Sequence, residues 1–390
     1  MIPFLKKGLV LASLSLVFSC NSATDNPVPP GTIVGATGLL IPSLGPVPTP
    51  PPKPSPVAPS LSLMTSPAFS SILAGGNFGG RDGVGEDAQF GDIKAMVLDL
   101  EGNILVADAA LNVIRKVTLS GEVSTVAGTG RHGKLDGKAN EATFNDPTGI
   151  SIDGSGNMYV ADSRNNRIRK VTNTGDVLTL TRTRGWYAAP DEGLQYDINR
   201  PHYIAAKKDG EVFVVDSSRQ ILKVTPNGEI SVYLDGHSKL KDKGWVEDIW
   251  FNPDNLAFDA NGDLLFADGG NRCIWRATSA GVAERILGRS YYDQGFVDGE
   301  HSVAKIGQIE GMAYDRDGNL YFSDSLNFSL RVLTKDGHVR TLIGDGVRGN
   351  ILGVATEARL GNLGGVVFGR DGHVYLADAG NRRILRVALR

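Results

Sequence analysis

Three side chains with oxygen ligands, Asp254, Asn255 and Glu310, form the set in this chain with the clearest chemical use. Carboxylate and amide oxygens are the ligands that calcium and other hard cations take from proteins. If the fold brings the three together, they could bind a hard cation such as calcium, and His202 could then act as a nearby general base, although no cofactor is required by the sequence. The alternative is that these polar side chains only line a water-filled pore.

An internal repeat would position these residues. Its marker is an aspartate that follows a short apolar strand, at positions 108, 162, 216, 268, 324 and 378. Each copy contains strand signals separated by glycine turns, which predicts a four-stranded meander. One such sheet cannot bury both of its apolar faces, but six sheets stacked around an axis can. The sequence therefore predicts an all-β, six-bladed β-propeller. The marker aspartates are expected to accept backbone N–H bonds within their turns.

The copy from Asn157 to Val171 reads NMYVADSRNNRIRKV, and its pattern recurs through residues 68–390. This pattern resembles the NHL repeat family, which implies a propeller of the NHL type. The last copy ends after its third strand, and the segment Ser70–Gly76 matches the fourth strand of the others. We predict that this N-terminal segment closes the last blade and removes its open edge.

The repeat also predicts a ring of variable residues at the channel mouth. The positions aligned with Thr148 hold Lys94, Thr148, His202, Asp254, Glu310 and Gly364. One step further along each strand stand Ala95, Gly149, Tyr203, Asn255, Gly311 and Gly365. These positions differ between copies while the frame does not, so we predict that Lys94, His202 and Tyr203 bind a ligand there. The loops between copies contain an Asp-Gly pair and an apolar anchor, as in Asp136-Gly137 with Phe144, so much of their length is expected to be structural.

The N-terminal residues predict export and attachment to a membrane. Residues 1–20 resemble a bacterial lipoprotein signal, with Lys6 and Lys7, an apolar stretch and Cys20 as the lipidated residue. The alternative is an ordinary secretory signal. Residues 21–67 hold 13 of the 19 prolines and predict a disordered tether, which leaves residues 68–390 for the propeller.

The charge balance argues against nucleic acid as a partner, because the formal net charge is −3 and no long basic run occurs. With Cys20 lipidated, Cys273 has no partner for an internal disulfide and is expected to be a core residue. We expect a monomer in the cell envelope, in the periplasm, on the outer membrane or at the cell surface.

Two functions remain open at this point. The first is a non-enzymatic binding module that presents its long-loop face to a protein or glycan. The second is a metal-dependent lactonase or lyase, since six-bladed propellers of the lactonase type place a metal at the channel mouth. A weaker third possibility is a structural envelope protein whose blade sides pack on a partner.

Overall fold

The computed structural model describes residues 67–181, 198–235, 251–278, 282–289 and 291–389, and the backbone of four short strands outside these ranges. Two of those strands, β1 (Thr32–Val34) and β2 (Leu40–Pro42), pair antiparallel within the separate unit Met1–Pro52. The predicted signal, Cys20 and the rest of the tether lie outside the described residues. Among the residues that the structure describes, no helix is long and apolar enough to cross a membrane.

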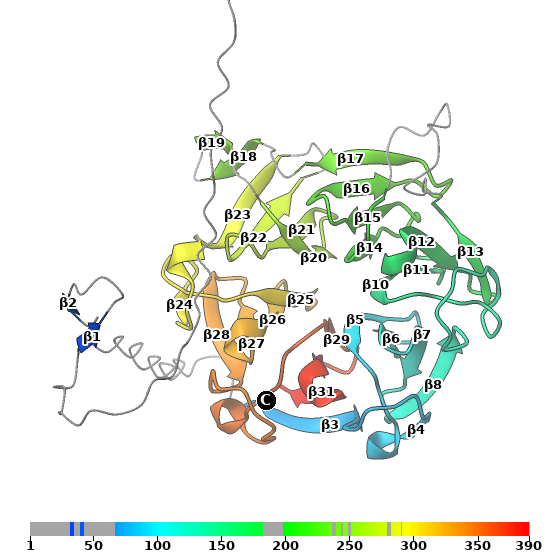
Figure 1. The fold of residues 1–390 in the computed structure, drawn as a ribbon, viewed down its shortest axis with the longest axis horizontal. Helices are drawn as coiled ribbons and strands as arrows, with labels where there is room; N and C mark the ends of the chain where they lie inside the picture. The colour runs from blue at the N-terminus through cyan, green and yellow to red at the C-terminus, as the bar shows by residue number, and fades with distance from the viewer. Residues whose placement is uncertain are drawn as a thin grey trace, which may run out of the picture. The chain divides into compact units, whose positions relative to one another are not determined.

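Six antiparallel sheets surround a central axis in the second unit, as Figure 1 shows. The first three blades are β5 (Ile93–Leu98), β6 (Ile104–Asp108), β7 (Val113–Val117) and β8 (Glu122–Ala127); β10 (Pro147–Ile152), β11 (Met158–Asp162), β12 (Arg167–Val171) and β13 (Asp176–Thr179); and β14 (Ile204–Ala206), β15 (Val212–Val215), β16 (Ile221–Val224) and β17 (Ile230–Leu234). The next two are β20 (Pro253–Phe258), β21 (Leu264–Asp268), β22 (Cys273–Ala277) and β23 (Ala283–Gly288); and β25 (Ile309–Tyr314), β26 (Leu320–Asp324), β27 (Ser329–Leu333) and β28 (His338–Ile343). The prediction of a six-bladed β-propeller is confirmed.

The sixth blade joins the two ends of the propeller. It consists of β29 (Val366–Phe368), β30 (Val374–Asp378), β31 (Arg383–Ala388) and the N-terminal β3 (Phe69–Gly75). Strand β3 pairs antiparallel with β31 from Phe69 opposite Ala388 to Gly75 opposite Arg383. The predicted closure is therefore confirmed.

Short elements in the loops extend this frame. Two-residue strands pair with the outer strand of blades 1, 2 and 5, and a hairpin lies beside blade 4. These strands are β4 (Gly83–Val84), β9 (Gly137–Lys138), β24 (Gly299–Glu300), β18 (Lys239–Asp242) and β19 (Trp245–Asp248). The 3-10 helices are η1 (Gly85–Asp87), η2 (Ser163–Asn165), η3 (Tyr291–Asp293), η4 (Ser325–Asn327), η5 (Ala355–Glu357) and η6 (Ala379–Asn381).

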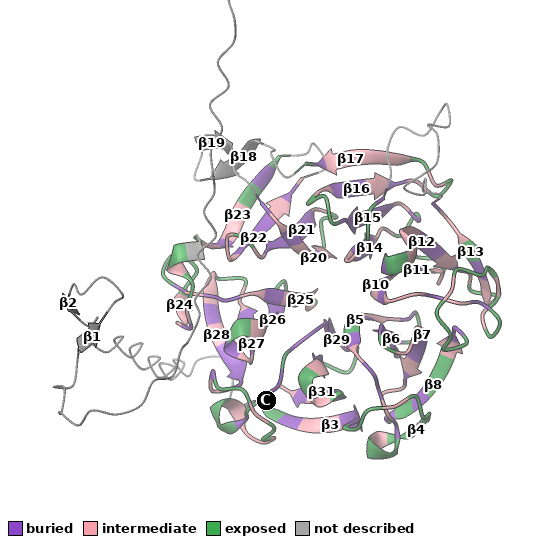
Figure 2. Ribbon diagram, in the orientation of Figure 1, coloured by how far each residue is buried: buried purple, intermediate pink, exposed green. Residues whose placement is uncertain are grey.

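Burial follows the position of a strand within its blade. The second strands β6, β21 and β26 are buried along their whole length, because a neighbouring blade covers each face. The outer strand β8 is exposed at three of its six residues (Figure 2). Cys273 is buried in the core of blade 4, as expected.

The marker aspartates accept backbone N–H bonds, but the prediction placed the main donors wrongly. In every blade one donor comes from the residues that precede the first strand, 16 or 17 positions earlier. These donors are Gly91 to Asp108, Asn145 to Asp162, Asn199 to Asp216, Asn252 to Asp268, Gly307 to Asp324 and Gly361 to Asp378. Each aspartate therefore fixes the end of the loop that leads to the channel mouth, rather than only its own turn.

Buried arginines fix these loops in blades 1, 2 and 5. The Arg169 side chain is fully buried and reaches Asp162 at 2.8 Å and the loop residue Asp136 at 2.7 Å. Arg115 pairs with Asp82, and Arg331 with Asp298 and Asp324, in the same way. The Asp-Gly loops are thus structural, as predicted from their regularity.

Candidate functional site

The first strands of the six blades lie nearest the central axis (Figure 1). Their entry residues line the mouth of the central channel on the long-loop side. A cavity of about 710 Å³ at this mouth is lined by all six residues of the predicted outer ring: Lys94, Thr148, His202, Asp254, Glu310 and Gly364. Below it the channel narrows to a space of about 50 Å³ lined by the predicted inner ring: Ala95, Gly149, Tyr203, Asn255, Gly311 and Gly365. The alignment of the repeats therefore placed both rings correctly.

Hydrogen bonds around Glu310 connect blades 3, 4 and 5 across the mouth. The Tyr203 hydroxyl donates to Oε2 of Glu310 at 2.6 Å, and Nε2 of Gln308 donates to Oε1 at 2.8 Å. Nδ2 of Asn255 donates to the backbone carbonyl of Glu310 at 3.1 Å. Burial raises the pKa of Glu310, and burial together with the Glu310 charge raises the pKa of Tyr203. Glu310 is thus held in one orientation at the wall of the cavity.

Asp254 has a carboxyl group with few partners. Nδ2 of Asn252 donates to its Oδ1 at 3.4 Å, a long contact. The carboxyl group lies over Gly269, where a Cβ would come within 1.6 Å of Oδ2, so only glycine leaves room for it. Burial, and then the charges of Glu310 and Asp268, raise the pKa of Asp254 to about 7, with Arg272 acting in the opposite direction. The mouth therefore holds a carboxyl group that changes charge near neutral pH.

The remaining predicted residues lie on the other side of the mouth. Burial, followed by the charge of Arg200, lowers the pKa of His202, so its imidazole is neutral at pH 7. The hydroxyl of Thr148 donates to the backbone carbonyl of His202 at 3.1 Å. Lys94 is exposed at the rim and pairs with Asp92 at 2.8 Å. The mouth thus combines carboxyl groups, one amine, one imidazole and one phenol.

The three predicted metal ligands share the mouth but do not form a cage. Asp254 and Glu310 line the wide cavity, whereas Asn255 lines the narrow one below it. Both carboxylate oxygens of Glu310 already accept protein hydrogen bonds. Within the described residues no group of three or more histidine, cysteine, aspartate or glutamate side chains is arranged to hold a metal ion. The calcium site therefore stays a prediction.

The sequence reasoning missed several residues that shape the site. Asp92 and Asp146 also line the cavity, and Gln308 and Asn252 orient its carboxyl groups. These four residues stand directly before the first strands, so extending the repeat alignment by two positions would have found them. The role of Gly269 carries no signal in the repeat, because it depends on the side chain of Asp254.

Comparisons with known proteins agree with this architecture. Residues 144–171 match the model of the NHL repeat. NHL repeat-containing protein 2 of Bos taurus is 23% identical over 330 residues, which cover 75% of this chain and 45% of that protein. The chain is an NHL-repeat-containing six-bladed β-propeller. This NHL propeller spans about half the length of the curated relatives it matches.

Solved structures share the fold of this NHL propeller. A protein of Bacteroides thetaiotaomicron described as an auxiliary nutrient binding protein has a TM-score of 0.63 and 16% identity, covering 83% of this chain and 76% of that one. The virginiamycin B lyase of Staphylococcus aureus has a TM-score of 0.50 and 12% identity, covering 83% and 99%. At these identities the likeness shows the fold alone.

The raised pKa of Asp254 predicts a pH-dependent gain in stability for the Asp254→Asn variant. The pKa of Asp254 is 3.8 in the unfolded chain and about 7 in the folded one. At pH values between these two, the folded state holds a proton that the unfolded state has lost. Stability therefore falls as pH rises through this range, and it stays lower above it. At pH 8 we expect the Asn variant to be more stable by about 2 kcal/mol, with no difference near pH 4. Urea unfolding at both pH values measures this, and an equal effect at both would contradict it.

Proposed function

We propose that this chain is an extracytoplasmic binding module whose ligand, a protein segment or a glycan, enters the channel mouth on the long-loop face. The observation that carries the proposal is the coincidence of two features. The outer-ring position holds a different residue in each of the six otherwise similar repeats, and it is this position that lines the 710 Å³ cavity in every blade. A frame that is held constant while one cavity lining changes is typical of a scaffold that carries a specificity site.

The lining chemistry fits groups that both donate and accept hydrogen bonds. Glu310 and Asp254 offer carboxylate oxygens, and Lys94 and His202 stand on the other side of the cavity. Hydroxyl groups of a glycan or polar groups of a protein loop can bridge such opposed partners. The proteins described as nutrient-binding share this fold, which supports a binding role but does not identify the ligand.

Attachment to the membrane is part of the same proposal. A lipid on Cys20 and the proline-rich stretch of residues 21–67 would hold the propeller away from the membrane surface. Detergent phase partitioning of the full chain and of Cys20→Ser tests this. The Cys20→Ser protein should move to the aqueous phase, and retention of both in the detergent phase would contradict the assignment.

A pair of matched variants tests the mouth. Ligands captured from envelope protein extracts and from a glycan array are measured against native protein, Glu310→Gln and Glu229→Gln. Glu310→Gln should weaken binding by about tenfold or more, because it removes the negative charge and replaces one of the two oxygens that accept from Tyr203 and Gln308 with a donor. Glu229 is exposed in the turn between β16 and β17 at the opposite end of the propeller and serves as the control. A ligand that binds all three proteins equally would place its site elsewhere.

One observation keeps an enzymatic role in view as a second proposal. Asp254, with a pKa of about 7, lines the same cavity as the neutral His202, and such a pair can exchange protons near neutral pH. A lactonase or lyase of the metal-dependent kind would in addition need a cation at Asp254, Asn255 and Glu310. Elemental analysis of purified native protein and of Glu310→Ala decides between the two proposals. Stoichiometric metal that Glu310→Ala loses would favour the enzyme.

A further inference from the structure

At one position of the repeat, a buried aromatic residue lies at the interface between neighbouring blades in four of the six cases and is missing in the other two. In four blades the third residue before the marker aspartate is aromatic and is buried towards the next blade. These residues are Tyr159, Phe213, Tyr321 and Tyr375. The ring centroid of Phe213 lies 5.5 Å from that of Phe258, and the ring centroid of Tyr321 lies 5.2 Å from that of Phe368. The hydroxyl of Tyr159 approaches Gly210 so closely that a Cβ there would lie 3.0 Å from it, and Tyr375 packs in one core cluster with Leu98. An aromatic ring thus closes these four interfaces at the end of the propeller opposite the mouth.

Two of the three tyrosines share a second contact, whereas the third, Tyr375, donates to Oδ2 of Asp371, only four residues earlier, at 2.8 Å. The Tyr159 hydroxyl donates to Oδ2 of Asp153 at 3.0 Å, and the Tyr321 hydroxyl donates to Oδ2 of Asp315 at 3.2 Å. In both blades the aspartate stands six residues earlier, in the turn that leads into the second strand. The interfaces that follow blades 2 and 5 therefore each accommodate a phenol ring, with apolar surroundings for the ring and a carboxylate that accepts from its hydroxyl.

Blades 1 and 4 carry leucine instead, at Leu105 and Leu265, and their interfaces are open. A cavity of about 420 Å³ lies between blades 1 and 2, and one of about 670 Å³ lies between blades 4 and 5. Leu265 is fully buried and belongs to the same core cluster as Leu320, with Tyr314 packed against it. Leu265 does not itself line the larger cavity, but Leu320 and Tyr314, which pack with it, do, so a longer tyrosine side chain at position 265 is expected to extend between them towards the cavity.

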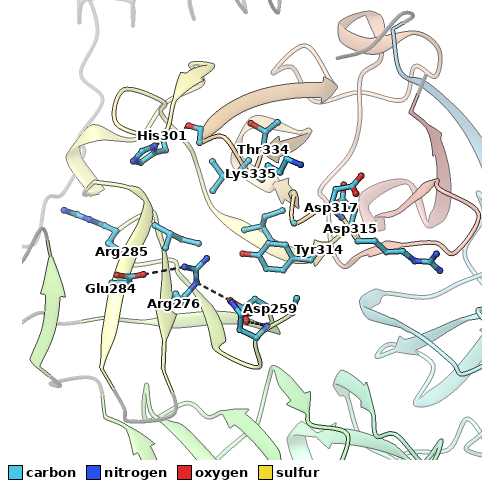
Figure 3. A pocket seen from close by; sticks show the side chains of 18 residues that line it. Asp259, Arg276, Glu284, Arg285, His301, Tyr314, Asp315, Asp317, Thr334 and Lys335 are labelled. Carbon is cyan, nitrogen blue, oxygen red and sulfur yellow. Dashed lines mark hydrogen bonds and ion pairs between the residues drawn. The ribbon is translucent and has the colours of Figure 1, made fainter. Parts of the chain in front are cut away.

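Figure 3 shows that the blade 4–5 groove retains the partners of the missing ring. Asp259 stands six residues before Leu265, and its side chain is 6% exposed. Its Oδ1 accepts the backbone N–H groups of Asn261 and Asp263. Its Oδ2 forms an ion pair with Nε of Arg276 at 3.3 Å, and a carboxylate oxygen with one such partner can still accept a hydrogen bond. The ring of Tyr314 forms the facing wall.

We propose that the groove between blades 4 and 5 binds a phenol ring supplied from outside the propeller, with its hydroxyl donating to Asp259 and its face against Tyr314. The ring takes the place that Tyr159 and Tyr321 occupy at their own interfaces. The blade 1–2 groove is the weaker candidate, because it is smaller and presents Ile152 and Lys116 where this one presents Tyr314 and Arg276. The phenol belongs either to a small molecule or to a tyrosine side chain of a partner.

The test uses p-cresol, which is the side chain of tyrosine as a free molecule. Isothermal titration of the full chain should show one saturable site. Leu265→Tyr should abolish that binding and raise the melting temperature, because the new side chain fills the groove and can bond Asp259 as Tyr321 bonds Asp315. Leu105→Tyr, the same change at the other open interface, should leave binding unchanged. Binding of p-cresol to Leu265→Tyr as tight as to native protein would overturn the proposal.

Further variants keep the result decisive. If Leu265→Tyr does not fold, Asp259→Asn should weaken p-cresol binding at least fivefold, while Asp99→Asn, its counterpart beside Leu105, should not. Equal affinities for these two variants would also overturn the proposal. Glu310→Gln at the mouth should bind p-cresol normally, so failure of this site and failure of the mouth can be distinguished. A short tyrosine-containing peptide that binds more tightly than p-cresol would identify a protein partner as the source of the phenol, and equal binding would identify a small molecule.

Discussion

Removal of residues 1–76 is expected to unfold the propeller, whereas removal of residues 1–67 is expected to leave its stability unchanged. Strand β3 contributes six residue pairs to blade 6 and buries Leu73 and Ala74 in the core. Without it, the buried strand β31, including Leu385 and Val387, becomes an exposed edge. We expect a loss of more than about 5 kcal/mol, which is comparable with the whole stability of many domains.

Two truncated chains make this measurement. Residues 68–390 keep β3 and serve as the control, and residues 77–390 lack it. Circular dichroism melting and size-exclusion chromatography should show a cooperative monomer for the first and aggregated or unfolded protein for the second. If residues 77–390 formed a monomer with an unchanged melting temperature, the closure by β3 would not be what holds the ring together.

The fold could be predicted because the repeat reports the same structure six times. A single copy such as residues 157–171 has a weak strand signal, but its recurrence fixes both the number of blades and the open end that Ser70–Gly76 must fill. The two rings at the mouth could be predicted for the same reason, since equivalent positions of a repeat lie at equivalent heights along the axis. Lys94, His202, Asp254 and Glu310 therefore line one cavity, as expected.

The chemistry of the mouth could not be predicted in the same way. The bond between Tyr203 and Glu310 joins residues 107 positions apart, and it depends on the side-chain rotamers of both residues. The carboxyl group of Asp254 packs directly against Gly269, and this close approach leaves no periodic signal in the sequence. Whether the mouth binds calcium, a glycan or a protein depends on such details, so the metal assignment remains a prediction.

Two further structural features leave a signal in the aligned repeats. The residue three before each marker reads Leu, Tyr, Phe, Leu, Tyr, Tyr, and the two leucines mark the open interfaces. An arginine seven residues after the marker occurs in blades 1, 2 and 5. Alternation along a strand suggests that a charged side chain faces solvent, yet all three of these arginines are fully buried. Their acidic partners in the loops, 33 residues earlier, explain why burial is tolerated.

One of these arginines supports the second large prediction. The guanidinium of Arg169 binds two carboxylates and the backbone carbonyls of Thr143 and Leu135, so Arg169→Leu would leave Asp162 charged and buried without its cation. Loss of one partner of a buried ion pair costs about 3–5 kcal/mol, and we expect a loss in that range at pH 8. Leucine is the matched replacement because blade 3 carries Leu222 at the equivalent position of its sheet.

The pH dependence separates this cause from simple loss of packing. Burial already raises the pKa of Asp162 with Arg169 present, and removal of the arginine raises it further. The folded variant can then take up a proton on Asp162 that the unfolded chain releases, so its stability falls as pH rises and the deficit should be smaller at pH 5 than at pH 8. Arg167→Leu, on the same strand but half-buried, should cost less than about 1 kcal/mol at either pH. Urea unfolding of both variants at both pH values measures this. A pH-independent loss for Arg169→Leu, or equal losses for the two variants, would mean that the unpaired charge of Asp162 is not the cause of the destabilisation.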